Sequence, residues 1–138
     1  NQVSEIYGNQ AITIMIDYKG DNNNVFTENG TKNIHLSVDR LLNEIKMYNF
    51  GEIILHSMDK DGTGNGFDLN LINKIENLPN KPILLMGGAG KPEHIIEALK
   101  NNKVSGAITA NLLNFIGEGL KITRNLAIEN KIKIAKLT

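Results

Sequence analysis

The stretch that decides the fold is Gly87-Gly88-Ala89-Gly90-Lys91, which separates two segments of different periodicity. The apolar run 82–86 (PILLM) precedes it, and the helical pattern 92–99 (PEHIIEAL) follows it. A strand, a glycine turn and a helix form a geometry in which backbone N–H groups can approach an anion, because glycine has no Cβ. Glycines at such a turn also serve tight turning, so the stretch alone leaves both roles open.

The same βα pattern recurs along the rest of the chain. Nearly continuous apolar runs are typical of strands in a parallel sheet that is buried on both faces. Strands are predicted at residues 11–16, 52–56, 82–86 and 105–109, and helices at 34–48, 68–75, 91–101 and 117–130. We also expect a hairpin within residues 18–33, an N-cap at Asp68 and a short helical turn at 111–115. The chain therefore predicts an α/β fold of four βα units with right-handed crossovers.

Two parallel architectures fit this order of elements. One is a doubly wound open sheet of four strands, and the other is half of a (β/α)8 barrel, since a complete barrel takes about 250 residues. Polar and glycine-rich segments follow the strands in either case, and they include Asp17, Asp59, Asp61 and the glycine run. This is the edge where α/β folds place their active sites. Composition does not decide between the two architectures.

Composition excludes several classes of protein. Fifteen basic residues balance fifteen acidic ones, so net charge predicts no nucleic-acid partner and no membrane surface. No apolar run approaches the roughly 20 residues of a membrane span. The absence of cysteine suits a reducing compartment, and we expect a cytoplasmic protein. The chain begins with Asn1, so we expect a processed protein or a piece of a longer one.

Several motifs together resemble the cyclase subunit (HisF) of imidazole glycerol phosphate synthase, a (β/α)8 barrel of histidine biosynthesis. The pair formed by the Asp-x-Asp-Gly-Thr loop and the later Gly-Gly-Ala-Gly-Lys run is the most specific part, and the resemblance covers nearly the whole chain. The matching stretches are GNQA (8–11), IDYK (16–19), VFT (25–27), GTKN (30–33), GEIIL (51–55), SMDKDGT (57–63), GFD (66–68), GGAGK (87–91) and EH (93–94).

The resemblance implies a parallel (βα)4 half of a TIM barrel, with residues 1–138 as its C-terminal half, the fifth to eighth βα units. It also implies a lyase reaction without a metal or other cofactor. Ammonia from a glutaminase (HisH-like) subunit attacks a phosphoribulosyl-formimino carboxamide ribotide, and imidazole glycerol phosphate is one of the products. Two aspartates, one in each half-barrel, act as general acid and base. Each half-barrel holds one of the two phosphates of the substrate.

The resemblance also assigns roles to residues. Asp17 matches the second catalytic carboxylate, and Lys19, two residues further, has either a catalytic role or a structural salt bridge. The substrate and phosphate site comprises Asp61, Gly62, Thr63, Gly87, Gly88, Ala110 and Asn111. Asp61 repels phosphate, so we expect it to fix the loop or a substrate hydroxyl, while Gly62 offers an N–H. We expect Lys91 in solvent, and His94 and His35 to be structural or exposed.

Three residues depart from the family pattern at the rim of the site. His56 stands where a threonine is usual, Met86 where a serine precedes the glycines, and Asn111 where a serine helps to hold phosphate. His56 and the adjacent Ser57 are therefore further candidate site residues. The alternative function is that of a related cyclase-like subunit, which delivers ammonia to a glycosyl amidotransferase of surface-polysaccharide sugar biosynthesis.

The chain contains only one half of the expected barrel. The other catalytic aspartate, the other phosphate site and half of the ammonia channel would lie in an N-terminal half-barrel. We therefore expect this half to be inactive alone. It should also expose two unpaired strand edges and one face of its core, which favours self-association.

Overall fold

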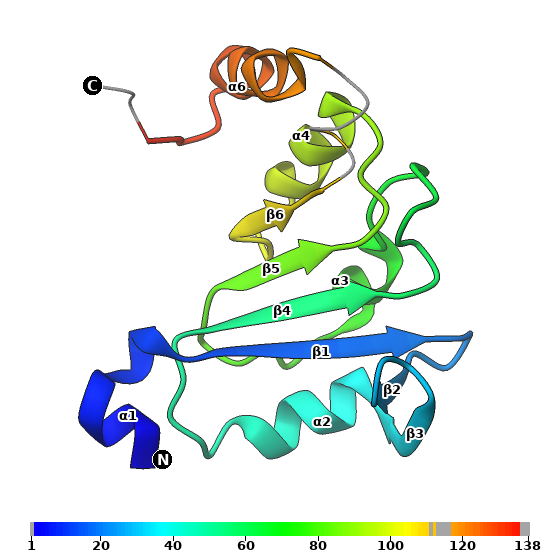
Figure 1. The fold of residues 1–138 in the computed structure, drawn as a ribbon. Helices are drawn as coiled ribbons and strands as arrows, with labels where there is room; N and C mark the ends of the chain where they lie inside the picture. Colours follow the sequence, from blue (N-terminus) through cyan, green and yellow to red (C-terminus); the bar gives the residue numbers. More distant parts are fainter. Residues whose placement is uncertain (1, 111, 113–116, 136–138) are drawn as a thin grey trace.

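The computed structural model describes residues 2–110, 112 and 117–135, and it contains the four predicted βα units (Figure 1). Its elements are α1 (Gln2–Tyr7), the 3-10 helix η1 (Asn9–Ala11), β1 (Thr13–Lys19), β2 (Asn24–Thr27), β3 (Lys32–Ser37), α2 (Val38–Ile45), β4 (Glu52–Ser57), α3 (Leu69–Lys74), β5 (Ile83–Met86), α4 (Pro92–Lys100), β6 (Gly106–Ile108) and α6 (Gly119–Glu129). Among these described residues, no helix is long and apolar enough to cross a membrane. The predicted helical turn at 111–115 lies outside them, except for Leu112.

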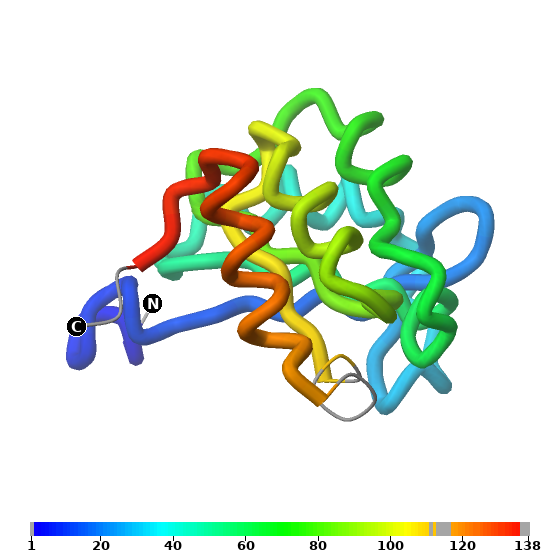
Figure 2. The backbone as a smooth tube through the Cα atoms, turned by 90° about the horizontal axis from the view of Figure 1, so that it is seen from above, coloured from blue at the N-terminus to red at the C-terminus, as the bar shows by residue number. Residues whose placement is uncertain are grey.

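The order of strands in the sheet distinguishes the two architectures that the sequence left open. The sheet runs β3-β2-β1-β4-β5-β6, and its parallel strands β1, β4, β5 and β6 follow one another in chain order. A doubly wound sheet reverses direction at a switch point, whereas a barrel adds each strand beside the previous one. The helices α2, α3 and α4 correspondingly pack on the same side of the sheet (Figures 1 and 2). The observed order is that of a barrel.

Only one face of the parallel strands is buried in this chain. Along β4 and β5 buried side chains alternate with half-buried ones, and Ile53, Leu55, Ile83 and Leu85 all point into the core. The opposite face carries Met15, which is 52% exposed. The expectation of burial on both faces was therefore wrong for the chain by itself, because the sheet does not close and nothing in the described part of the chain covers its second face. We call this second face the open face.

The segment after β1 also differs from the prediction. The helix expected from Ile34 begins only at Val38, because residues 32–37 form β3, the second strand of the expected hairpin. The Ser37 hydroxyl accepts a hydrogen bond from the Arg40 N–H and caps the helix. The apolar residue Ile34 fits both periodicities, so the sequence pattern extended the helix too far. The hairpin pairs with residues 17–19 of β1, so the free edge of that strand is shorter than expected.

Asp68 caps α3 as predicted and also ties that helix to β1. Its Oδ1 accepts from the Leu71 N–H at 3.1 Å, and its Oδ2 accepts from the Tyr18 hydroxyl at 3.2 Å. Tyr18 is 2% exposed. Burial, together with the neighbouring Asp68 carboxylate, raises the pKa of the Tyr18 phenol above its usual range. This neutral phenol fixes the end of β1, next to the position of Asp17.

Loss of a core side chain on the helix-covered face should destabilise the fold strongly. Ile53→Ala removes a fully buried side chain from β4, and we expect it to lower the free energy of unfolding by about 2–5 kcal/mol. The matched change Ile128→Ala on α6 truncates a side chain that is 59% exposed, and it should cost less than about 0.5 kcal/mol. Urea denaturation measures both, and equal losses would show that the core is wrongly placed.

Candidate active site at the carboxyl ends of the strands

Asp17 lies near the carboxyl end of β1 with its side chain on the open face. Its register partner on β4 is His56, and the partner of His56 on β5 is Met86. These three residues therefore form one row across the sheet. The Asp17 side chain is 24% exposed, so it can meet a ligand without being fully solvated. A carboxylate in this place fits acid–base chemistry.

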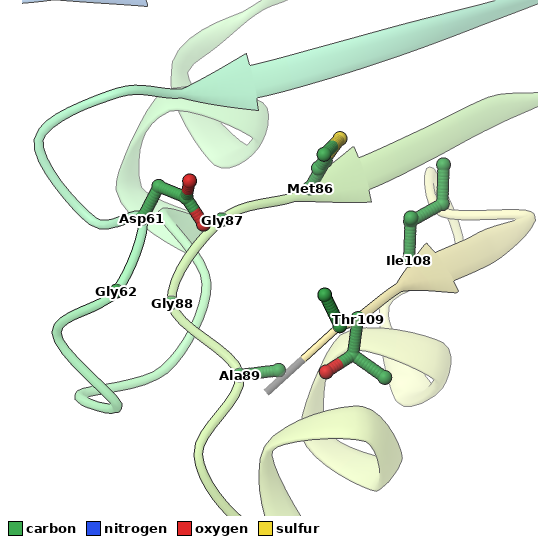
Figure 3. A pocket seen from close by; sticks show the side chains of 9 residues that line it. Asp61, Gly62, Met86, Gly87, Gly88, Ala89, Ile108 and Thr109 are labelled. Carbon is green, nitrogen blue, oxygen red and sulfur yellow. The ribbon is translucent and has the colours of Figure 1, made fainter. Parts of the chain in front are cut away.

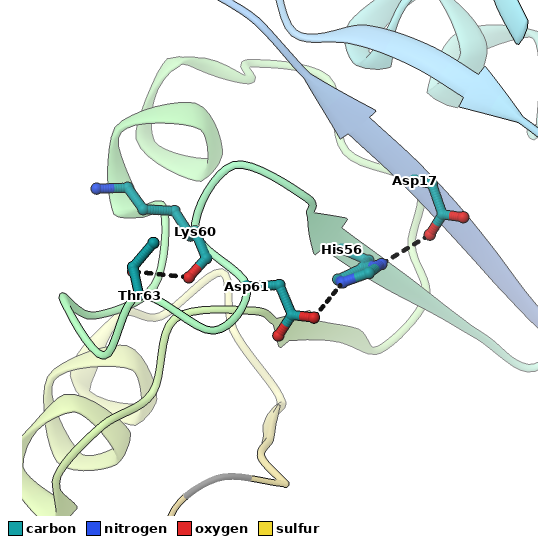
Figure 4. Close-up of polar contacts among 5 residues, drawn as sticks. All are labelled: Asp17, His56, Lys60, Asp61 and Thr63. Carbon is teal, nitrogen blue, oxygen red and sulfur yellow. Dashed lines mark hydrogen bonds and ion pairs between the residues drawn. The ribbon is translucent and has the colours of Figure 1, made fainter. Parts of the chain in front are cut away.

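His56 stands between two carboxylates (Figure 4). Its Nδ1 lies 2.8 Å from Asp17 Oδ1, and its Nε2 lies 3.7 Å from Asp61 Oδ2. The imidazole is 14% exposed, whereas the Asp61 side chain is 57% exposed. The sequence named His56 as a departure from the family pattern and, for that reason, as a candidate site residue. The structure brings it into direct contact with Asp17.

The loop after β4 is held by contacts within itself and to β1. The Asp59 carboxylate accepts from the Gly20 N–H at 2.6 Å, so Asp59 joins the two loops that follow neighbouring strands. The Thr63 hydroxyl donates to the Lys60 carbonyl at 2.7 Å and accepts from the Asn65 N–H. Asp61 is left with its carboxylate toward His56 and toward the adjacent cavity. The loop thus presents Asp61 while using the Thr63 hydroxyl internally.

A cavity of about 210 Å³ opens beside this loop (Figure 3). Loops that follow three neighbouring strands contribute to it, since Asp61 and Gly62 come after β4, Gly87 and Gly88 after β5, and Ala110 after β6. The remaining lining residues are Met86, Ala89, Ile108 and Thr109. Its walls therefore combine backbone from glycine loops with apolar side chains. The single carboxylate among the lining side chains is that of Asp61.

The glycines of the cavity are required by sterics. Gly87 and Gly88 have φ values of 94° and 103°, a region that disfavours side chains. A Cβ at Gly87 would lie 2.5 Å from the Ser57 carbonyl oxygen, and one at Gly88 would lie 2.2 Å from the Gly66 carbonyl oxygen. The Gly66 N–H in turn donates to the Gly88 carbonyl at 2.8 Å. The close approach of two loops accounts for these glycines. Because glycine has no side chain, the main chain itself forms this part of the cavity wall.

Several predicted residues lie elsewhere. Ser57 is 3% exposed on the helix-covered face, since it follows His56 by one position. Lys19 donates from Nζ to the Gly30 carbonyl at 2.9 Å, and it lies over the Phe26 ring, so it holds the hairpin. Thr63 does not line the cavity. Asn111 lies outside the described residues.

The residues that were expected to be structural or exposed are so. His94 accepts at Nδ1 from the Gly90 N–H at 3.2 Å, so it fixes the glycine turn before α4. Lys91 and His35 are exposed.

Sequence reasoning missed three residues of the cavity wall, Ala89, Ile108 and Thr109. Their positions at the ends of strands and within the glycine run could have identified them. Ile108 ends β6 and Thr109 follows it, so both stand at the edge where the other site residues gather. Ala89 belongs to the glycine run itself.

Comparison with known proteins identifies the family. The family model described as histidine biosynthesis protein matches residues 1–118.

This chain belongs to that family.

Among curated proteins, the chain is 40% identical over 128 residues to a putative imidazole glycerol phosphate synthase subunit hisF2 of Parasynechococcus marenigrum. The aligned residues cover 91% of this chain and 48% of that protein. It is 44% identical over 101 residues to the imidazole glycerol phosphate synthase subunit HisF of Sulfurisphaera tokodaii, covering 72% of this chain and 41% of the relative. The HisF subunit of Streptococcus mutans is 31% identical over 134 residues, or 95% of this chain and 53% of the relative.

These matches confirm the resemblance that the motifs indicated. The chain spans about half the length of the curated relatives that it matches. Together with the strand order, this confirms the predicted (βα)4 half of a TIM barrel.

The glycine loop gives a direct test of the cavity. Gly88→Ala should distort the contact with Gly66 and lower the free energy of unfolding by more than the roughly 1–2 kcal/mol that a left-handed backbone costs by itself. Gly20→Ala is the matched control, because Gly20 has a φ of 79° but open space where a Cβ would lie. Urea denaturation measures the loss of stability in both variants. Equal costs for the two variants would mean that the loops do not approach closely.

Proposed function

We propose that this chain is the C-terminal half, the fifth to eighth βα units, of an ammonia-dependent cyclase subunit of imidazole glycerol phosphate synthase. The observation that carries the proposal is the juxtaposition of Asp17 with the glycine-lined cavity at one edge of one sheet. A carboxylate for proton transfer and a backbone cradle for phosphate are the two parts that such a half-barrel would supply.

The residues divide between these two tasks. Asp17 serves as a general acid or base toward the reacting ribotide, because it is partly exposed on the open face. Gly87, Gly88 and Ala110 hold one phosphate of the substrate at the cavity wall. Asp61 carries a negative charge, so it serves the loop and a substrate hydroxyl rather than the phosphate itself.

The names of the relatives favour the cyclase over the ammonia-delivering subunit of a sugar amidotransferase. All three relatives compared above are named as subunits of imidazole glycerol phosphate synthase. His56 and Met86 nevertheless change the row beside Asp17, so turnover with the cyclase substrate is the decisive assay. The proposed reaction is cytoplasmic, which suits a chain without cysteine.

The proposed partners are a glutaminase subunit that supplies ammonia and an N-terminal half-barrel that covers the open face. Residues 13–16 of β1 lack a strand partner on one side within the described chain, and β6 ends the sheet. Apolar side chains are exposed on the helices at the two ends of the chain, namely Val3, Ile6 and Tyr7 on α1 and Leu120, Ile122 and Ile128 on α6. A second half-barrel would bury these edges and faces.

Replacing the proposed catalytic carboxylate tests the function. In a complete barrel that carries this half, Asp17→Asn should lower ammonia-dependent kcat by about 100-fold or more, because the amide cannot transfer the proton. KM should change little, since the phosphate cradle is intact. Asp39→Asn removes an exposed carboxylate from the first turn of α2 and serves as the control. Unchanged kcat in Asp17→Asn would remove the catalytic assignment.

The open face predicts that this chain associates with itself when no other half is present. Sedimentation velocity at tens of micromolar should show a dimer or larger species, and this half alone should not turn over the cyclase substrate. Met15→Lys places a charge on the open face and should shift the chain toward monomer, whereas Met47→Lys changes a side chain that is 78% exposed and should not. A clean monomer in the unmodified chain would count against self-association.

A further inference from the structure

One buried polar atom of the site has no partner. His56 Nε2 has less than 1 Å² of accessible surface and no hydrogen bond. The nearest charged group on that side is Asp61 Oδ2 at 3.7 Å, just beyond hydrogen-bond distance. A buried nitrogen without a partner is unfavourable, so this arrangement calls for an explanation.

The other side of the ring fixes which nitrogen carries the proton. An ionised carboxylate only accepts hydrogen bonds, so His56 Nδ1 donates to Asp17 Oδ1 at 2.8 Å. In the neutral imidazole Nε2 then has a free lone pair, and that lone pair faces the Asp61 carboxylate. Asp61 Oδ2 and Nε2 therefore cannot form a hydrogen bond unless a second proton arrives at Nε2.

The cavity supplies a reason for that proton to arrive. Asp61 is the lining carboxylate, and an anion held at Gly87 and Gly88 would repel it. The Asp61 carboxylate is 57% exposed on a loop, so it can move toward His56. A movement of less than about 1 Å would bring Oδ2 within hydrogen-bond distance of Nε2.

We propose that His56 is a positioning residue that couples the orientation of Asp17 to the occupancy of the glycine-lined cavity through Asp61. The proposal rests on the proposed function only in taking this cavity as an anion site. When the anion binds, Asp61 moves to the ring and Nε2 takes up one proton from solvent. The imidazolium then donates to both carboxylates, from Nδ1 to Asp17 and from Nε2 to Asp61.

Among the described residues, few groups face the ring, which makes the coupling specific. Asp17 approaches from β1 and Asp61 from the loop after β4, and the register neighbour on β5 is the uncharged Met86. With His56 bound on both sides, one Asp17 oxygen is occupied and the other stays free toward the open face. The Asp17 carboxylate, which His56 already contacts in the free chain, is then held by a stronger hydrogen bond from a charged ring when a phosphorylated ligand is present.

Nuclear magnetic resonance of the ring nitrogens tests the proposal in the chain itself. Sodium sulfate is the probe, because its charge does not change near neutral pH, and sodium chloride at equal ionic strength is the control. In the free chain His56 should show the Nδ1-protonated neutral ring. His94 is an internal reference, because its Nδ1 accepts from the Gly90 N–H and its ring should carry the proton on Nε2. His56→Asn assigns the signals.

Sulfate should shift the Gly87 and Gly88 amides and convert His56 to the doubly protonated ring, with uptake of about one proton per sulfate bound. Asp61→Asn should keep the Nδ1-protonated ring but abolish the uptake, because no charge moves to Nε2. If His56 had only a structural role, sulfate would change neither the protonation of its ring nor the number of protons that the chain binds.

Three results would overturn the proposal and separate it from the proposed function. An Nε2-protonated neutral ring in the free chain would remove the contact that positions Asp17. Sulfate shifts at Gly87 and Gly88 without a change at His56 would remove the coupling and leave the anion site standing. No sulfate shifts at either glycine would remove both the coupling and the phosphate role of the cavity.

Discussion

The structure depends on one constraint, the sequential parallel order of β1, β4, β5 and β6 with α2, α3 and α4 packed on one face. This order fixes which side chains reach the core and which reach the open face. Ile53 and Leu55 of β4 pack under the helices, whereas the side chain of His56 lies on the open face. Because parallel strands end at the same edge, the loops after three strands converge on one cavity.

The cavity is shaped by backbone approach as much as by side chains. Gly87 and Gly88 leave no room for a Cβ against the carbonyls of Ser57 and Gly66, so the loops after β4 and β5 support each other. Asp59 joins the loop after β4 to the end of β1 through the Gly20 N–H. The loop that carries Asp61 is consequently held by contacts on both sides, while the Asp61 carboxylate itself stays exposed. This frame therefore presents one exposed carboxylate, that of Asp61, at the cavity wall.

Local signals in the sequence predicted much of the fold. The apolar runs located the four strands, and Asp68 marked the start of α3, because periodicity and capping are properties of neighbouring residues. Residues 34–37 were misassigned because a short apolar pattern fits a strand or a helix. For the site, Asp17, Asp61, Gly87 and Gly88 could be predicted, since motifs and strand ends place them.

The remaining features of the site depend on contacts between distant residues. His56 meets Asp17 across 39 positions of sequence through the register of two strands, which no local pattern encodes. Ser57 was lost from the site because one step along a strand reverses the face. The internal hydrogen bonds of Thr63 likewise depend on the folded loop. The open face, in contrast, was expected from the sequence, because half of a barrel exposes one face of its core.

Combining this chain with an N-terminal half-barrel from the HisF subunit of a relative is the most direct test that it is half of a catalytic barrel. The two halves should form a one-to-one complex in sedimentation, and the complex should convert the ribotide to imidazole glycerol phosphate with added ammonia, while neither half does so alone. Halves that remain separate, or a stable complex without turnover, would show that the open face and Asp17 do not form half of this active site.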